Sequence, residues 1–296
     1  DFIASGIALS ISYVGGDGND VELTAGEQDP VYVDDAWLAT DRIEIASGTD
    51  PDGTGPARSF GFDSFATIQA GIDAVAAGGE VIIYDHAGTG YPEALVIDDS
   101  TWSDKGLRSH RPLIVAMSLT AAMDNHPVID GSGLLGTGLT IEGIQSTITV
   151  SGLEIANSFF IGIHSQGVLT LIDTKVDGGF SGIVVDGGTA DIGQTWVTGT
   201  EIFGVEIIND GDADIANSEI IDNTYIGVMV AEGSADIEQT RLANNGNGVI
   251  VTNDGTATIY DSDLGGNTKM ALENASAIDT VNASGNWWGT TDEEAV

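Results

Sequence analysis

Four segments between Gly182 and Leu264 can be superimposed almost residue for residue. They read GIVVDGGTADIGQTWV (182–197), GVEIINDGDADIANSEI (204–220), GVMVAEGSADIEQTRL (227–242) and GVIVTNDGTATIYDSDL (248–264). Their leading glycines are separated by 22, 23 and 21 residues. A period of about 20–24 residues is typical of solenoids, in which a repeat buries its apolar side chains only by stacking on its neighbours.

Two apolar columns run through these repeats, and the second always follows the first by five residues. The columns are Leu171, Ile192, Ile215, Ile237 and Ile259, and Val176, Val197, Ile220, Leu242 and Leu264. Apolar and polar residues alternate over short runs, which indicates strands, and the frame of leucine-rich repeats is missing. We therefore predict an all-β, right-handed parallel β-helix with three short strands per coil and coils ~4.8 Å apart.

The N-terminal segment 1–26 is predicted to form a β-hairpin that assembles with another subunit. Its first strand carries alternating apolar residues, namely Ile7, Leu9, Ile11 and Tyr13. The turn at 15–20 is similar to a calcium-binding nonapeptide, but Glu22 occupies the position of a large apolar residue, so a glycine-rich hairpin turn is the preferred interpretation. Because no coil needs this hairpin, we expect it to join protomers head to tail into a homopolymer or to bind other surface proteins.

Both ends of the β-helix (81–296) are predicted to be capped. Residues 27–80 form an irregular N-terminal cap with one helix at 64–77, N-capped by Asp63 or Ser64 and ended by Gly78-Gly79. The apolar face of this helix carries Phe65, Ile68, Ile72 and Val75. At the C-terminus Trp287 and Trp288 are predicted to close the last coil, with carbohydrate stacking as the alternative.

The chain is strongly acidic, with 8 basic and 46 acidic residues and a net charge of −38. Such a charge repels nucleic acids, anionic membranes and polyuronates, and it attracts divalent cations; the alternative role is solubility. The sequence has no cysteine and no apolar run of the ~20 residues that a membrane helix needs. It begins Asp1-Phe2 without a basic region, so we expect a processed product or a piece of a longer protein.

Two sets of acidic residues are candidate calcium ligands. Asp191, Asp214 and Asp236 occupy one strand position, and Asp186, Asp210, Glu232 and Asp254 each precede a glycine in one predicted turn. Like charges stacked about 5 Å apart repel one another unless a cation bridges them, and Ca²⁺ takes six to eight oxygen ligands. The alternative is that these are solvated corners whose Asp-Gly pairs serve turn geometry.

The sequence also resembles a known superfamily. The repeats, VYVDDAW (31–37), the segment at 50–84 and SGNWWGT (284–290) are similar to right-handed parallel β-helix proteins of the pectate-lyase-like superfamily, in particular to a domain of large bacterial surface proteins. The resemblance covers roughly residues 31–290 and implies an extracellular or cell-surface location. It does not select an activity, because members include lyases, hydrolases, adhesins and spacers.

The sequence provides little support for catalysis. The short signatures of the polygalacturonase-like hydrolases are absent, chance pairs of carboxylates are unavoidable among 46 acids, and His164 is predicted to be a lone outward histidine. We therefore expect a non-catalytic rod or filament subunit. The alternative is a carbohydrate-binding or polysaccharide-degrading module for a neutral glycan, with its site among basic residues in the loops at 98–111 and 118–126.

Overall fold

The computed structural model describes residues 2–4, 7–15, 20–25, 30–35, 63–75, 79–84, 90–98, 113–116, 126–134, 136–143, 147–157, 160–276 and 281–289. The chain forms two compact units, one of Asp1–Tyr91 with Arg111–Pro127 and one of Pro92–His110 with Val128–Val296. This division lies inside the range 81–296 that the sequence analysis assigns to one β-helix. Across the described residues, no helix is both long and apolar enough to span a membrane.

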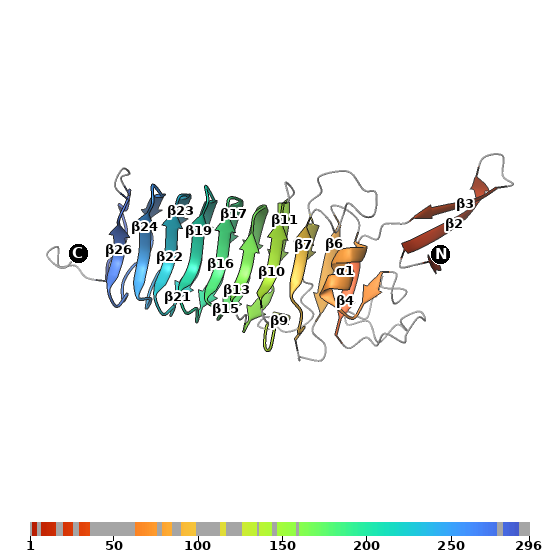
Figure 1. The fold of residues 1–296 in the computed structure, drawn as a ribbon, viewed down its shortest axis with the longest axis horizontal. Coiled ribbons are helices and arrows are strands. Elements are labelled where there is room, and N and C mark those ends of the chain that lie inside the picture. The colour runs from red at the N-terminus through yellow and green to blue at the C-terminus, as the bar shows by residue number, and fades with distance from the viewer. Residues whose placement is uncertain are drawn as a thin grey trace. The chain divides into compact units, whose positions relative to one another are not determined.

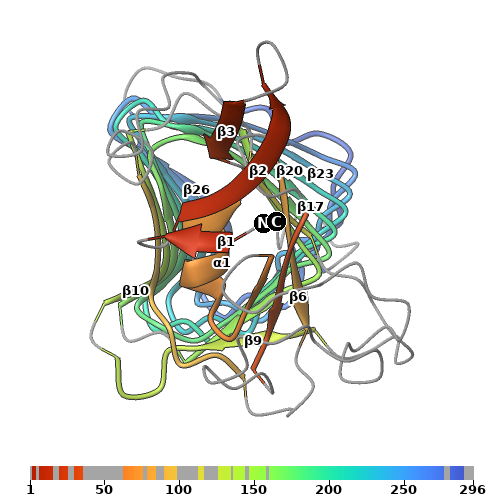
Figure 2. The same cartoon turned by 90° about the vertical axis from the view of Figure 1, so that its right-hand side faces the viewer.

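The second unit is a parallel β-helix with three sheets, whose coils superimpose when viewed along the stack (Figures 1 and 2). Sheet I contains β7 (Leu95–Asp98), β10 (Thr137–Glu142), β13 (Ile161–Ser165), β16 (Ser181–Asp186), β19 (Phe203–Ile208), β22 (Ile226–Ala231), β24 (Asn247–Thr252) and β26 (Met270–Asn274). Sheet II contains β11 (Thr147–Ser151), β14 (Val168–Ile172), β17 (Thr189–Gly193), β20 (Asp212–Ala216), β23 (Ser234–Glu238) and β25 (Thr256–Tyr260). Sheet III contains β9 (Val128–Asp130), β12 (Glu154–Ala156), β15 (Lys175–Asp177), β18 (Trp196–Thr198) and β21 (Glu219–Ile221).

The predicted apolar columns form the interior of this unit. Leu171, Ile192, Ile215, Ile237 and Ile259 are register partners along sheet II, and each is fully buried. Val176, Val197 and Ile220 are partners along sheet III, and Leu242 and Leu264 continue their buried column. The expected all-β parallel β-helix is therefore confirmed.

The repeating glycine at the second position of most sheet I strands is required by close packing between coils. A Cβ atom on Gly182 would lie 2.6 Å from the carbonyl oxygen of Gly204 and 2.6 Å from Cγ1 of Val197. Gly204 approaches the carbonyl oxygen of Gly227 equally closely, at 2.6 Å. The leading glycines therefore mark positions where any side chain would collide with the next coil.

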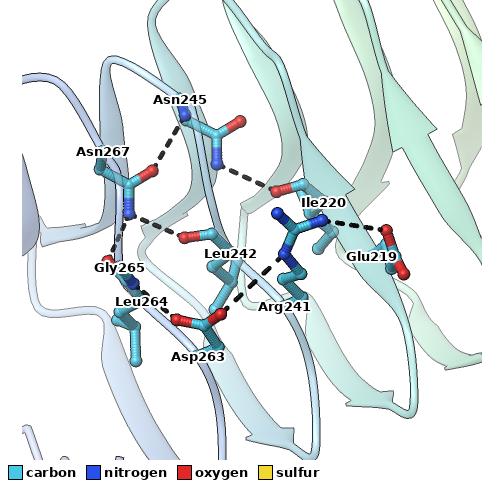
Figure 3. A network of polar contacts seen from close by, with 9 residues as sticks. All are labelled: Glu219, Ile220, Arg241, Leu242, Asn245, Asp263, Leu264, Gly265 and Asn267. Atoms are coloured by element: carbon cyan, nitrogen blue, oxygen red, sulfur yellow. Dashed lines mark hydrogen bonds and ion pairs between the residues drawn. The ribbon is translucent and has the colours of Figure 1, made fainter. Parts of the chain in front are cut away.

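A buried ladder of polar side chains, which the sequence analysis missed, supports the turns between coils. Oδ1 of Asn223, Asn245 and Asn267 accepts from the backbone N–H of Thr200, Asn223 and Asn245, at 3.1, 3.0 and 3.0 Å. Asn245 also donates to the carbonyl oxygen of Ile220 at 2.9 Å (Figure 3). Buried backbone groups that strands leave unpaired are satisfied in this way. The spacing of 22 residues between these asparagines was the available sequence signal.

The first unit contains a small parallel sheet with one helix packed on it. The sheet order is β8-β6-β4-β5, with β4 (Val31–Asp34), β5 (Ser64–Phe65), β6 (Glu80–Tyr84) and β8 (Leu113–Ala116). Helix α1 (Ile68–Ala74) approaches β4 through Gly71, whose added Cβ would lie 2.6 Å from Cγ2 of Val33. Helix residues Ile68 and Ile72 are fully buried within this unit.

The helix is shorter than predicted and has a different N-cap. Ser64 and Phe65 pair with β4 as a strand, so the predicted start at 64 was wrong. Thr67 is the N-cap, because its side chain accepts from the backbone N–H of Ala70 at 3.4 Å. Val75 is the C-cap residue and 3% exposed, whereas Phe65 is half-buried on β5.

The N-terminal strands β1 (Phe2–Ala4), β2 (Ile7–Gly15) and β3 (Asp20–Ala25) form an antiparallel sheet in the order β1-β2-β3. The predicted assembly residues Ile7, Leu9, Ile11 and Tyr13 all belong to β2. In the antiparallel pair of β2 and β3, Ile11 lies opposite Leu23. Assembly through this segment stays a prediction.

The two C-terminal tryptophans occupy different positions of the last coil. Trp287 forms a parallel bridge with Asp263, which continues the outward column of Glu219 and Arg241, and it is 49% exposed. Trp288 follows at the position of the apolar column and is half-buried. Closure of the last coil therefore stays a prediction for Trp288, while Trp287 points outward.

Candidate functional site

The outer face of sheet I brings ionisable side chains from successive coils into contact. His164 on β13, Val184 on β16 and Glu206 on β19 are register partners. Asp186 stands two residues after Val184, on the same side of the pleat. The sequence analysis did not predict this cluster, because only the strand register shows that residues about 20 positions apart are neighbours.

Asp186 is held by three polar side chains. Its Oδ1 accepts from Nδ2 of Asn209 at 2.6 Å, and its Oδ2 accepts from Nε2 of Gln166 at 2.8 Å. Nε2 of His164 lies 3.2 Å from the same Oδ2. The hydrogen bond from Asn209, followed by those from Gln166 and His164, lowers the pKa of Asp186. The carboxylate is therefore ionised and fixed in orientation.

Glu206 lies on the adjacent strand in the opposite electrostatic situation. It is half-buried beside Val184, which is only 3% exposed, and Ser181 Oγ donates to its Oε2 at 3.4 Å. Burial raises the pKa of Glu206, and the charge of Asp186 raises it further. Neighbouring carboxyls with pKa values displaced in opposite directions are the arrangement that acid–base catalysis uses.

The prediction that His164 is a lone histidine was wrong. Its side chain is outward and 21% exposed, but it pairs with Asp186, which is 18% exposed. Asp186 is two residues beyond the register partner of His164, so a search along the sequence could not pair them.

Beyond Glu206 the outer face of sheet I carries more apolar side chains. Met229 and Ile250 follow Glu206 at the same register position, before Glu273 on β26. Phe203, Ile226, Asn247 and Met270 are register partners at the start of the strands; Asn247 is buried, and Met270 is 43% exposed. A partly exposed apolar surface beside a polar cluster is typical of a ligand-binding face.

The strand ladder of aspartates lies on sheet II, as predicted. Asp191, Asp214 and Asp236 are register partners, and all three are exposed. Burial raises the pKa of Asp214, and the charges of Asp212, Asp236 and Asp191 raise it further. The ladder therefore brings like charges together at some cost in stability.

The predicted ladder of acidic turn residues is wrong in one member. Asp210, Glu232 and Asp254 have left-handed backbone conformations, with φ of 63, 59 and 64°. Asp186 instead ends β16 in register with Ile208. The prediction aligned Gly187 with Gly211 and Gly233, but Thr189 is the register partner of Asp212, so Gly188 is the equivalent glycine and Asp186 lies one residue too early for the turn.

Asp210, Glu232 and Asp254 line a shared open concavity of about 840 Å³. Its other lining residues are Gly211, Gly233, Ser234, Asn253, Thr256 and Ala275. Within the part of the chain that the structure describes, no group of three or more His, Cys, Asp or Glu side chains converges as metal ligands. Calcium binding by either acidic set therefore stays a prediction.

The basic loop site that the sequence analysis offered as an alternative lies almost entirely outside the described residues. Of its histidines, arginines and lysine only His126 is described, at the end of the first unit.

Comparison with protein-family models and with curated proteins gives no match. Among solved structures, pectate lyase Pel9A is 12% identical, with a TM-score of 0.54 over 88% of this chain and 78% of that one. The A-module of mannuronan C-5 epimerase AlgE6 from Azotobacter vinelandii is 18% identical, with a TM-score of 0.34 over 68% of this chain and 72% of that one. The GH136 lacto-N-biosidase from Eubacterium ramulus is 9% identical, with a TM-score of 0.34 over 87% of this chain and 67% of that one.

These similarities concern the fold. The match to Pel9A confirms the predicted parallel β-helix fold. The other two similarities are too weak to carry an argument.

Proposed function

We propose that this chain is a carbohydrate-active β-helix that binds a glycan on the outer face of sheet I and hydrolyses a glycosidic bond there. The observation that carries the proposal is the pair of Asp186 and Glu206 on adjacent strands, with pKa values lowered and raised respectively. Glycoside hydrolysis needs one protonated and one ionised carboxyl beside the scissile bond. The shared fold with a pectate lyase supports a carbohydrate ligand as a class.

The two carboxyls have distinct roles in the proposed reaction. Glu206 donates its proton to the glycosidic oxygen as the bond between that oxygen and the anomeric carbon breaks. Asp186 accepts a proton from the attacking water, whose oxygen bonds to the anomeric carbon. One water is consumed per bond, and exchange of protons with solvent restores both carboxyls.

His164, Gln166 and Asn209 are positioning residues in this scheme. They hold the two carboxylate oxygens of Asp186 at 3.2, 2.8 and 2.6 Å. A fixed carboxylate costs no reorganisation when the water approaches. Hydrolysis suits this face better than elimination from a polyuronate, because none of its described strands carries a Lys or Arg, and Lys269 only precedes β26 at its far end.

The test is release of reducing ends from xylohexaose, cellohexaose and mannohexaose by the whole chain. We expect Glu206→Gln to lower turnover by roughly 10²–10⁴-fold, because general acid catalysis contributes about that much. Asp236→Asn, an exposed carboxyl of sheet II, is the matched control and should leave turnover unchanged. Equal turnover by Glu206→Gln and the wild type would refute the assignment.

A structural subunit is the second candidate, and the N-terminal sheet favours it. Among the described strands, β1 and β3 each pair only with β2, so each leaves one edge open to another chain. Head-to-tail assembly through 1–26 would give a surface rod or filament outside the cell. Electron microscopy of the chain with and without residues 1–26 tests this, and polymers that persist after the deletion would reject it.

A further inference from the structure

A line of aromatic side chains, two of them exposed and two half-buried, lies where successive coils enter sheet I of the second unit. Phe160, Phe180 and Tyr225 directly precede β13, β16 and β22, and Phe203 begins β19. We call these four residues the aromatic strip. Phe160 and Tyr225 are 47% and 52% exposed. The strands that carry the strip lie side by side in Figure 1.

Backbone hydrogen bonds hold the members of the strip on adjacent coils. Ser181 N–H donates to the Phe160 carbonyl oxygen at 2.9 Å, and Phe203 N–H donates to the Phe180 carbonyl oxygen at 3.1 Å. The Phe160 and Phe180 rings stack with centroids 5.5 Å apart. From β13 to β22 the strip crosses three coil spacings, ~14 Å in all, which is the length of an oligosaccharide rather than one sugar.

The C-terminal end of the strip also shows features of a binding surface. Nζ of Lys269 lies 5.5 Å from the centre of the Tyr225 ring, and Met270 beside it is 43% exposed. Exposed large apolar side chains that gather on one face, here Phe160, Tyr225 and Met270, are typical of a binding surface. The buried interior of this unit is formed by its own apolar columns and does not include the strip residues.

We propose that the aromatic strip is a sugar-stacking platform, which holds an uncharged glycan along the stack of coils and beside Asp186 and Glu206. This inference rests on the proposed function and adds the substrate class and the direction of the chain. A ring face binds a pyranose through its C–H groups, so it favours sugars with equatorial hydroxyls. Polyuronates are disfavoured, because the chain carries a net charge of −38.

The position of the strip relative to Asp186 and Glu206 supports the proposed platform. Ser181, the hydrogen-bond partner of Glu206, directly follows Phe180. Glu206 lies on β19, the strand that Phe203 begins. Through this hydrogen bond the Glu206 carboxyl reaches the residue next to the strip, so a glycan stacked on these rings would run beside that carboxyl.

The experiment measures binding of xylohexaose, cellohexaose and mannohexaose, with polygalacturonate as the anionic comparison, by calorimetry on the whole chain. We expect at least one neutral hexasaccharide to bind, with affinity rising from the disaccharide to the tetrasaccharide. Phe160→Ala and Tyr225→Ala should each weaken binding about threefold to tenfold, the effect of losing one aromatic contact.

Trp196→Ala is the matched control, because Trp196 is also exposed, at 38%, but lies on sheet III. Its affinity and melting temperature should equal those of the wild type. Strip variants that bind as tightly as Trp196→Ala, or a wild type that binds only polygalacturonate or none of these glycans, would overturn the proposal.

Glu206→Gln separates this inference from the catalytic assignment. We expect it to bind the hexasaccharide as the wild type does while turnover is lost. Strip-dependent binding without any cleavage would reject the hydrolase assignment and leave the platform standing. Cleavage that depends on Glu206 but not on Phe160 or Tyr225 would reject the platform alone.

Discussion

The outer faces of sheets I and II are built on the same coils but carry different chemistry. On sheet II one outward position holds Asp191, Asp214 and Asp236 in succession, and partial burial together with the charges of the neighbouring carboxylates raises the pKa of Asp214. On sheet I one outward position holds His164, Val184, Glu206 and Met229 in succession, with Asp186 beside them, and the last three lie on the coils of the aspartates. Repetition of one residue creates repulsion, whereas variation between coils lets neighbouring groups have distinct pKa values and separate roles.

The largest expected effect that separates the two faces is the pH dependence of turnover. Glu206 must be protonated to act as the acid, so turnover should fall about tenfold per unit once the pH exceeds its raised pKa. Asp186 must be ionised, and because its pKa is lowered, activity should persist on the acid side until the pH falls through that value. Asp236→Asn should show the same profile, and a rate independent of pH would contradict the pairing.

The next effect concerns how tightly the coils pack beneath each face. Gly182→Ala should destabilise the protein by about 1–3 kcal/mol, the usual cost of overpacking, because its Cβ would lie 2.6 Å from the Gly204 carbonyl oxygen. Gly193→Ala on sheet II is the matched control, since the nearest atom to its Cβ is at 3.6 Å. Urea unfolding measures both, and equal midpoints would show that the glycine column is not required.

Calcium binding would distinguish the two faces through the aspartate ladder of sheet II, which is predicted to bind it. If this ladder binds Ca²⁺ as predicted, a concentration ten times the Kd should stabilise the wild type by about 1.4 kcal/mol. Asp214→Asn should lose that gain, whereas Glu206→Gln on sheet I should keep it. Melting temperatures with calcium and with a chelator provide the measurement, and no shift in the wild type would leave the ladder as a solvated surface.

The smallest effect is the repulsion within the ladder itself. Asp214→Asn without calcium should stabilise the protein at neutral pH by roughly 0.2–1 kcal/mol, the range for cross-strand pairs. Because the folded-state pKa of Asp214 is raised, this gain should vanish as the pH falls through that pKa and protonation removes the charge. Added salt should also reduce it.

Asp263→Asn is the contrasting variant for this last effect, and the free energies of unfolding of the two variants are compared. Asp263 Oδ2 lies 3.9 Å from Nε of Arg241, which also contacts Glu219 at 3.6 Å (Figure 3). Removing a carboxylate that has a cationic neighbour should not stabilise the protein. A gain as large as that of Asp214→Asn would mean that total charge, and not the ladder, is responsible.

The parts of the candidate site could be predicted from the sequence to different degrees. The aspartates of sheet II were predictable, because strands of equal length repeat at a constant spacing from the buried isoleucines. The turn residues were not, since Asp186 is followed by two glycines, and only the strand register shows that the second, Gly188, is the equivalent of Gly211. The helix start was misjudged because Ser64 has a strand partner that is distant in sequence.

The sequence by itself determined the β-helix, because a repeat of about 22 residues with alternating apolar positions can bury its side chains only by stacking. Only the tertiary structure decided which surface residues meet. His164 and Asp186 touch, and Glu206 lies next to them, because parallel register joins residues of different coils and turn length sets that register. Alternation along a strand identifies the outward positions, but contacts across coils depend on every turn between them.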